Sequence, residues 1–164
     1  MARVLLVGCG CRGQALAREL RSAGHAVRGT TRDPRRMPDI EAAGAEPYVG
    51  DPDRVGTLMG ALTGVTVLCW LMGTASGERE RVFALHDARL RMLWEKLVDT
   101  PVRGVVYEAA GSVEDAALVR GEAVARVAHE TWRIPLAYLR EDPADRPAWL
   151  RGARAAVDGL LGVA

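Results

Sequence analysis

The stretch VLLVGCGCRGQALA, residues 4–17, decides the fold of this chain. It contains most of an apolar run over residues 3–7, which is typical of a buried strand. Gly8, Gly10 and Gly13 follow at the spacing G-x-G-x-x-G, and small residues and leucines at helical spacing come next. The glycine spacing alone is a weak signal. A strand before it and a helix after it make it informative, because that order begins a βαβ unit.

Each glycine of this loop has a physical task in a turn that binds phosphate. Gly8 permits the tight turn, Gly10 lets the backbone approach a pyrophosphate, and Gly13 lets the helix pack closely on the strand. The free N–H groups and the positive dipole end of the helix then face the anion, beside Cys11 and Arg12 of the same loop. The loop therefore predicts a dinucleotide-binding site, and the alternative is a glycine-rich turn without a ligand.

Strand-like and helix-like stretches alternate along the rest of the chain. Apolar runs predict strands at residues 3–7, 26–30, 46–49, 65–71, 104–108 and 136–140. Helical spacing predicts helices at residues 13–23, 34–43, 51–62, 78–99, 114–131 and 147–161. This alternation is typical of an α/β protein with a doubly wound parallel sheet, the Rossmann fold, in the strand order 3-2-1-4-5-6. The length of 164 residues predicts a single domain over residues 1–164.

Charge and residue content exclude several classes of protein. A formal net charge of +1 argues against a protein that binds nucleic acid through bulk charge. The chain has no apolar run of about eighteen residues, so we expect no transmembrane helix and no membrane partner. The first apolar run leads into a glycine turn instead of a cleavage site, so we expect a cytoplasmic protein. Three cysteines make no disulfide framework, and no Cys and His spacing predicts a metal site.

The end of the second predicted strand bears on which dinucleotide binds. NAD-binding proteins place an acidic residue there, about 20 positions after the loop. This chain has Thr30 and Thr31, then Arg32, and two further arginines follow within four residues. A hydroxyl followed by a guanidinium suits a 2′-phosphate, which the guanidinium binds bidentately. Arg12 is expected to approach the same phosphate. We therefore predict NADP(H) in preference to NAD(H), with a solvated arginine cluster as the alternative.

Four stretches in this order and spacing resemble the extended and atypical short-chain dehydrogenase/reductases, which include epimerase-like and NmrA-like NAD(P)-binding proteins. The stretches are residues 4–13, AVRGTTRDP at 26–34, GAEPYVGDPDRVGTLMGALTGVTVLCWLMG at 44–73, and GVVYEAAGSV at 104–113. The resemblance extends to about Arg140. It rests on the order and spacing of the motifs, since each motif taken alone is loose.

The resemblance implies cofactor contacts after three of the predicted strands. In this family the Asp after the third strand contacts adenine, and here that residue is Asp51. The segment after the fourth strand passes beneath the ribose, which here implies Leu71, Met72 and Gly73. The segment after the fifth strand lies beside the nicotinamide, and here it includes Ala110.

The catalytic residues of that family do not occur at the matching positions. The family uses a Tyr-x-x-x-Lys pair, in which the tyrosine transfers a proton and the lysine lowers the tyrosine pKa. The three tyrosines of this chain are followed four residues later by Pro, Gly and Asp, and its single lysine is Lys96. By alignment, Leu118 and Glu122 stand at the two positions, and Ala110 replaces the family's serine. The catalytic residues therefore stay unknown.

Three interpretations of function follow from these observations. The first is a truncated protein that binds NADP(H) and acts as a cofactor-dependent sensor or regulator. The second is an NADPH-dependent oxidoreductase for a small carbonyl or sugar-nucleotide-like substrate, with Glu108 or Ser112 and a dimer partner completing a non-standard site. The third is a structural interaction module with an empty nucleotide cleft, against which the glycine loop argues.

Apolar side chains outside the predicted core indicate a protein contact. Phe83 and Trp94 lie beside the core stripe of the helix predicted at 78–99. Members of the family commonly pair through this helix and the one at 114–131. The resemblance therefore implies a homodimer in which Phe83 or Trp94 approaches its symmetry mate. An unknown protein partner is the alternative, and Trp132 and Trp149 are further candidates for partner-facing side chains.

Four polar residues are expected to have structural or solvent-exposed places. Asp33 should cap the helix predicted at 34–43, and Ser112 should cap the helix predicted after the fifth strand. His86 is expected on the surface of its helix. Glu108 is expected at a solvated strand end.

Overall fold

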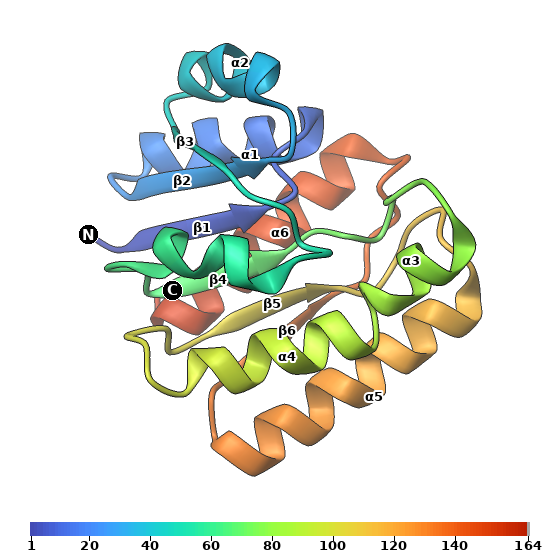
Figure 1. Cartoon of the computed structure of the whole chain (residues 1–164). Coiled ribbons are helices and arrows are strands. Elements are labelled where there is room, and N and C mark those ends of the chain that lie inside the picture. The colour runs from blue at the N-terminus through green and yellow to red at the C-terminus, as the bar shows by residue number, and fades with distance from the viewer. Residues whose placement is uncertain (164) are drawn as a thin grey trace.

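The computed structural model describes residues 1–163 and shows a parallel sheet with helices on both faces (Figure 1). The sheet has six strands in the order β3-β2-β1-β4-β5-β6, and every pairing is parallel. The strands are β1 (Arg3–Val7), β2 (Ala26–Thr31), β3 (Glu46–Val49), β4 (Val67–Trp70), β5 (Val105–Glu108) and β6 (Leu136–Leu139). The Rossmann fold and its strand order, as predicted from the sequence, are confirmed.

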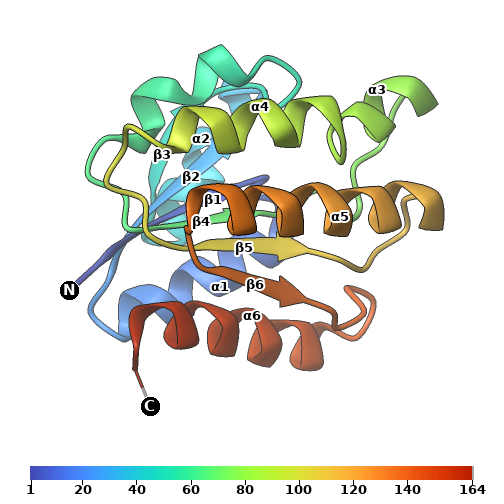
Figure 2. The same cartoon turned by 90° about the horizontal axis from the view of Figure 1, so that it is seen from below.

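The helices alternate with the strands along the chain. They are α1 (Cys11–Ser22), α2 (Met37–Ala42), α3 (Arg79–Ala84), α4 (Ala88–Leu97), α5 (Asp115–Trp132) and α6 (Arg146–Leu161), with 3₁₀ helices η1 (Pro34–Arg36) and η2 (Val55–Leu62). Figure 2 shows α1 and α6 on one side of the sheet and α4 and α5 on the other. No helix within residues 1–163 is long and apolar enough to cross a bilayer. In the same residues, no three His, Cys, Asp or Glu side chains gather where they could hold a metal ion.

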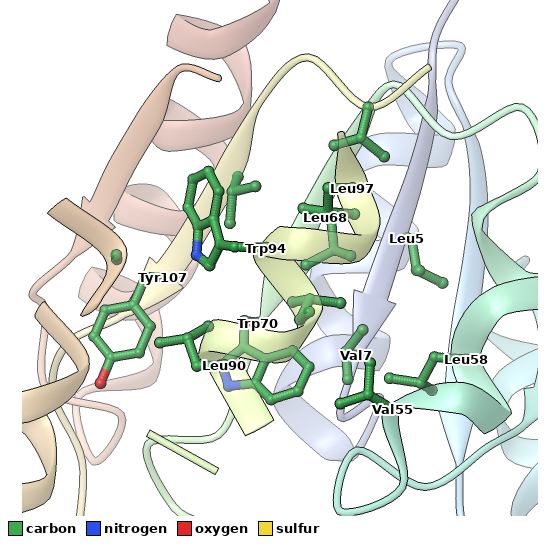
Figure 3. Packing of buried hydrophobic residues seen from close by; sticks show 14 of the residues in the cluster. Leu5, Val7, Val55, Leu58, Leu68, Trp70, Leu90, Trp94, Leu97 and Tyr107 are labelled. Carbon is green, nitrogen blue, oxygen red and sulfur yellow. The ribbon is translucent and has the colours of Figure 1, made fainter. Parts of the chain in front are cut away.

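Two cores lie on the two faces of the sheet, and β1 contributes to both. Leu5 and Val7 belong to the core beneath η2, α4 and α5, whereas Val4 and Leu6 belong to the core beneath α1, α2 and α6. This follows from the strand period of two, which sends successive side chains to opposite faces. Figure 3 shows the first core, in which Trp94 projects from α4 among leucines and valines. Burial on both faces explains the continuous apolar runs in the central strands.

The prediction of a single helix at 78–99 is wrong, because the chain forms α3 and α4 with a break between them. At the break, the Leu85 carbonyl accepts a hydrogen bond from Trp70 Nε1 at 3.0 Å. In a continuous helix that carbonyl would accept from the N–H four residues later. The buried side chain of Trp70, on β4, thus donates the hydrogen bond that a helical N–H would otherwise donate. The residue after Leu85, His86, is fully buried.

Three further predictions about helices meet different outcomes. Asp33 does cap the helix that follows it, since its Oδ1 accepts from the Arg35 N–H at 3.0 Å. Ser112 does not cap α5, because the N-cap residue is Glu114 and Ser112 is solvent-exposed. The helix predicted at 51–62 is the 3₁₀ helix η2, which begins at Val55.

Candidate functional site

A cleft of about 510 Å³ opens at the carboxyl ends of the strands (Figure 1, right-hand ends of the arrows). It lies where β1 is flanked by β2 on one side and β4 on the other, which is the switch point of the sheet. Ligands of open α/β sheets bind in such crevices. Seven residues predicted from the sequence line this cleft: Gly8, Gly10, Thr30, Thr31, Arg32, Asp51 and Met72.

The glycine loop forms the floor of the cleft and requires glycine at its first position. Gly8 has a φ of +93°, a conformation that side chains rarely adopt. A Cβ at Gly8 would lie 2.7 Å from the Leu71 carbonyl oxygen. At Gly10, apart from its chain neighbours, no atom of residues 1–163 lies within 4 Å of the place that a Cβ would take, so the backbone is open to a ligand. The loop thus has the shape of a cradle that can receive a phosphate.

The amino end of α1 faces a second, smaller pocket of about 200 Å³. Gly10 is the N-cap residue and has no side chain to cover the first turn, which contains no acidic residue. The positive end of the helix dipole is therefore available to an anion. Four more predicted residues line this pocket: Cys11, Arg12, Gly13 and Leu71.

The two threonines at the end of β2 hold the local structure together. Thr30 is buried, and its Oγ1 accepts a hydrogen bond from the Gly8 N–H at 3.2 Å. Thr31 Oγ1 accepts from the Asp33 N–H at 3.1 Å. Both hydroxyls thus engage in bonds that shape the loop and the turn after β2.

Arginine side chains border the cleft beyond β2. Arg32 and Arg36 both line it and are solvent-exposed, whereas Arg35 turns to Asp33, with an Nη2–Oδ2 distance of 3.0 Å. In the sequence, Arg36 is one of the two further arginines that follow Arg32. The turn of η1 places it at the border of the cleft.

A third arginine, Arg81 of α3, lines the cleft and was missed by the sequence analysis. Arg81 forms an ion pair with Asp53, with its Nε 4.0 Å from the carboxylate. The same carboxylate lies 3.2 Å from Arg89 Nε. Asp51 Oδ1 accepts from the Asp53 N–H at 2.9 Å, which orders the turn after β3. No sequence motif marks Arg81, which lies on the short helix α3 and is joined to the turn after β3 by Asp53.

Arg12 lies apart from Arg32 and does not line the 510 Å³ cleft. Its Nη2 donates to Thr74 Oγ1 at 2.8 Å, and its guanidinium carbon lies 5.3 Å from the centre of the Trp149 ring. The expectation that Arg12 shares a 2′-phosphate with Arg32 therefore has no support in this geometry.

The prediction of a solvated Glu108 is wrong, since its side chain is 0% exposed. Its two oxygens accept from the Gly73 N–H and from Trp149 Nε1, each at 2.7 Å. Trp149 is 1% exposed, so it is not partner-facing either. Burial raises the pKa of the Glu108 carboxyl, and the Arg12 guanidinium, 3.6 Å away, opposes that rise. Glu108 joins β5, α6 and the loop after β4.

Gly73 and Ala110 contact each other instead of opening toward the cleft. A Cβ on Gly73 would collide with the Ala110 carbonyl oxygen. The Gly73 carbonyl accepts from the Val113 N–H at 3.1 Å. These two positions, assigned to the cofactor by resemblance, join the loops after β4 and β5.

The prediction of a surface His86 is also wrong. Its Nδ1 lies 2.7 Å from the Tyr107 hydroxyl and its Nε2 lies 2.9 Å from the Met72 carbonyl oxygen. A neutral ring satisfies both contacts when Nε2 donates to the carbonyl and Nδ1 accepts from the hydroxyl. Burial lowers the pKa of His86 and raises that of Tyr107. The pair thus supports Met72 from behind the cleft.

We expect the free energy of unfolding to decrease as the pH falls below about 6.5, with His86 as a cause. Its pKa is lower in the folded than in the unfolded chain, so the unfolded chain binds one more proton between the two values. Between these two pKa values, His86 lowers the free energy of unfolding by up to about 1.4 kcal/mol for each unit by which the pH falls. Urea unfolding from pH 7.5 to 5 measures it. His86→Gln should have a flatter profile than His129→Gln, and equal slopes would contradict this role.

Comparison with known proteins agrees with the glycine loop and the cleft. A family model described as NAD(P)H-binding matches residues 8–133. No curated protein matches the chain by sequence. The matched residues include the glycine loop, the end of β2 and the loops after β3, β4 and β5.

Three similar solved structures show the same fold. A short-chain dehydrogenase/reductase superfamily protein from Agrobacterium tumefaciens with bound NAD is 22% identical, with a TM-score of 0.70; the match covers 84% of this chain and 48% of that one. UDP-glucuronic acid 4-epimerase from Bacillus cereus in complex with NAD is 16% identical, with a TM-score of 0.68 and coverages of 85% and 56%. Triphenylmethane reductase from Citrobacter sp. complexed with NADP(H) is 18% identical, with a TM-score of 0.63 and coverages of 84% and 49%. The chain spans about half the length of these proteins.

Proposed function

The chain belongs to the NAD(P)H-binding family, and we propose that within it this protein binds NADP(H) in the cytoplasm as a cofactor-dependent sensor or regulator. One observation carries the preference for the 2′-phosphate: Arg32 and Arg36 border the cleft just beyond β2. NAD-binding relatives of this fold place an acidic residue near there to hold the ribose hydroxyls. Two guanidinium groups instead provide charge and paired donors for a phosphate.

The residues at the expected catalytic positions support binding without proton transfer. Leu118 is buried in an apolar cluster with Val113 and Ala117. Glu122 pairs with Arg140 at its carboxylate, and its carbonyl accepts from the Tyr138 hydroxyl at 3.0 Å. Neither position offers a phenol or an ammonium group to a substrate. General acid–base catalysis contributes about 10²–10⁴-fold to a rate, so we expect carbonyl reduction near background.

An NADPH-dependent oxidoreductase for a small carbonyl or sugar-nucleotide-like substrate is the second candidate. The observation in its favour is a pocket of about 320 Å³ beside Arg12, bordered by Ser112 and Asp142. Glu108 has no part in it, because both of its oxygens are already bonded within the core.

A side-by-side titration with NADPH, NADP, NADH and NAD tests the proposal. NADPH should bind roughly tenfold to a hundredfold more tightly than NADH, since a hydrogen bond to a charged group is worth about 1.5–3 kcal/mol. Equal affinities for NADPH and NADH would contradict it. Steady NADPH consumption with a broad panel of aldehydes and ketones would instead favour the oxidoreductase.

We also propose that the protein forms a homodimer through α4 and α5. Met92 of α4 and Val119 and Val127 of α5 are exposed, and a groove of about 300 Å³ between the two helices includes Trp132. Exposed apolar patches of this kind mark contact sites. Trp94 takes no part, because it is 0% exposed, which corrects its predicted place at the symmetry axis.

Light scattering on a sizing column should give twice the chain mass of 17.7 kDa at micromolar concentration. Val127→Asp should shift the protein to the monomer, because two buried aspartates would face each other across a two-fold axis. Val49→Asp is the matched control, since Val49 is similarly exposed but lies on β3. A monomer for the unmodified chain, with and without NADPH, would refute the dimer and leave an unknown protein partner.

A further inference from the structure

Arg12 stands between the two small pockets that adjoin the glycine loop. It lines the 200 Å³ pocket at the amino end of α1, together with Gly10 and Trp149. It also lines the 320 Å³ pocket that borders Ser112. Thr74, which accepts the hydrogen bond from Arg12, lines both pockets as well. The Arg12–Thr74 contact is therefore the partition between them.

The partition is held by groups that are themselves fixed. The Glu108 carboxylate lies 3.6 Å from Arg12 and is fully buried between the Gly73 N–H and Trp149 Nε1. The Trp149 ring supports the guanidinium from the α6 side. Strand β5, helix α6 and the loop after β4 thus restrain one side chain, and only 22% of that side chain is exposed.

The loops after β4 and β5 contact each other closely at Gly73 and Gly111. Gly73 and Gly111 lie so near each other that a Cβ on either would collide with the backbone of the opposite loop. The hydrogen bond from Val113 N–H to the Gly73 carbonyl joins the loops further. At Gly73 and Gly111 the two loops therefore leave no room between them for a ligand.

A dinucleotide needs both halves of a Rossmann sheet, because each half binds one mononucleotide. The 510 Å³ cleft runs from the first half of this sheet, at Arg32 and Arg36, to the loop after β4, where Met72 and Thr74 line it. The pocket at the end of β5 is separate from that cleft and borders Arg12. We propose that the site recognises the 2′-phosphorylated adenosine diphosphate portion of its ligand and that Arg12 excludes the nicotinamide mononucleotide portion from the pocket at the end of β5.

This inference rests on the proposed function, since it concerns the same cleft, and it narrows the class of ligand. The contacts to the ligand end at the pyrophosphate, so the nicotinamide ring stays outside and its oxidation state has no influence on affinity. A regulator of this kind responds to the total amount of NADP and NADPH. It also binds other 2′-phosphorylated adenosine diphosphates.

Calorimetric titration of the full chain with NADPH, NADP, 2′-phospho-ADP-ribose and nicotinamide mononucleotide tests the inference. The first three should bind within about threefold of one another, and the mononucleotide should not bind. NADPH binding more than about tenfold more tightly than 2′-phospho-ADP-ribose would overturn it. If no adenosine ligand binds, the proposed function itself fails, and this result differs from the preceding one.

A pair of variants tests whether Arg12 is the barrier. Arg12→Leu combined with Glu108→Gln removes both charges together, so neither is left buried alone. Glu108→Gln by itself keeps Arg12 and is the matched control. The double variant should bind NADPH roughly tenfold more tightly than 2′-phospho-ADP-ribose, whereas the control should keep similar affinities. Similar affinities in a folded double variant would contradict the role of Arg12, and the titration of the unmodified chain decides the ligand class even if that variant does not fold.

Discussion

Replacing Arg32 with alanine should weaken NADPH binding roughly tenfold to a hundredfold and leave NADH binding nearly unchanged. Arg32 lines the cleft beyond the end of β2, where the guanidinium can donate two parallel hydrogen bonds to a 2′-phosphate. NADH has a hydroxyl at that position and offers no charge to bind. The loss should therefore appear in the ratio of the two dissociation constants, measured by titration at one fixed salt concentration.

Arg35→Ala is the matched control for Arg32→Ala. Arg35 is an exposed arginine only three positions from Arg32. Unlike Arg32, it pairs with Asp33 and does not line the cleft. Its removal should leave the preference for NADPH intact, and Arg36→Ala should reduce it, because Arg36 lines the cleft. The same loss of NADPH affinity in all three variants would show a general effect of charge and would contradict a specific 2′-phosphate site.

Replacing Glu108 with alanine should lower the free energy of unfolding by about 3–5 kcal/mol. The substitution leaves the Gly73 N–H and Trp149 Nε1 without a hydrogen-bond acceptor. It also leaves the Arg12 guanidinium without the carboxylate that balances its charge. Unpaired buried donors cost about 1–3 kcal/mol each. For a chain of this size the melting temperature should fall by about 6–20 °C, as calorimetry would measure.

Glu130→Ala is the control for this stability effect. Glu130 is exposed on α5, and surface substitutions of this kind change stability by about 0.5 kcal/mol or less. Glu108→Gln should lie between the two, because its amide oxygen can accept one of the two hydrogen bonds. A Glu108→Ala variant as stable as Glu130→Ala would show that the carboxylate does not join β5, α6 and the loop after β4 as the distances indicate.

The parts of the site that could be predicted from the sequence are those made by neighbouring residues. The glycine loop joins β1 to α1 within a few positions, and the φ of Gly8 is a local requirement that only glycine meets without strain. Arg32 and Asp51 follow strands directly, so they reach the switch point through the topology of the sheet alone. Strand order was predicted from the alternation of strands and helices together with the glycine loop, which is typical of the Rossmann fold.

The residues placed wrongly are those whose environment is made by partners distant in the chain. Glu108 looks like a polar end of a strand until Gly73 and Trp149, 35 and 41 positions away, supply two donors. His86 looks like a surface residue on a continuous helix until Trp70 bonds the Leu85 carbonyl and breaks that helix. A polar side chain is buried where hydrogen bonds from its partners offset its desolvation, and spacing along the chain does not record such partners.

By itself, the sequence determined the Rossmann fold, its strand order and the position of the glycine loop, because these depend on hydrophobic periodicity and on backbone conformations that glycine alone adopts freely. Only the tertiary structure decided where Arg12 points. The glycine loop borders both the 510 Å³ cleft and the 200 Å³ pocket, so the position of Arg12 in the sequence does not decide which of them its side chain lines. Thr74, Glu108 and Trp149, which come from the loop after β4, from β5 and from α6, hold it at the 200 Å³ pocket: Thr74 accepts from its Nη2, Glu108 faces its charge and Trp149 packs against its guanidinium.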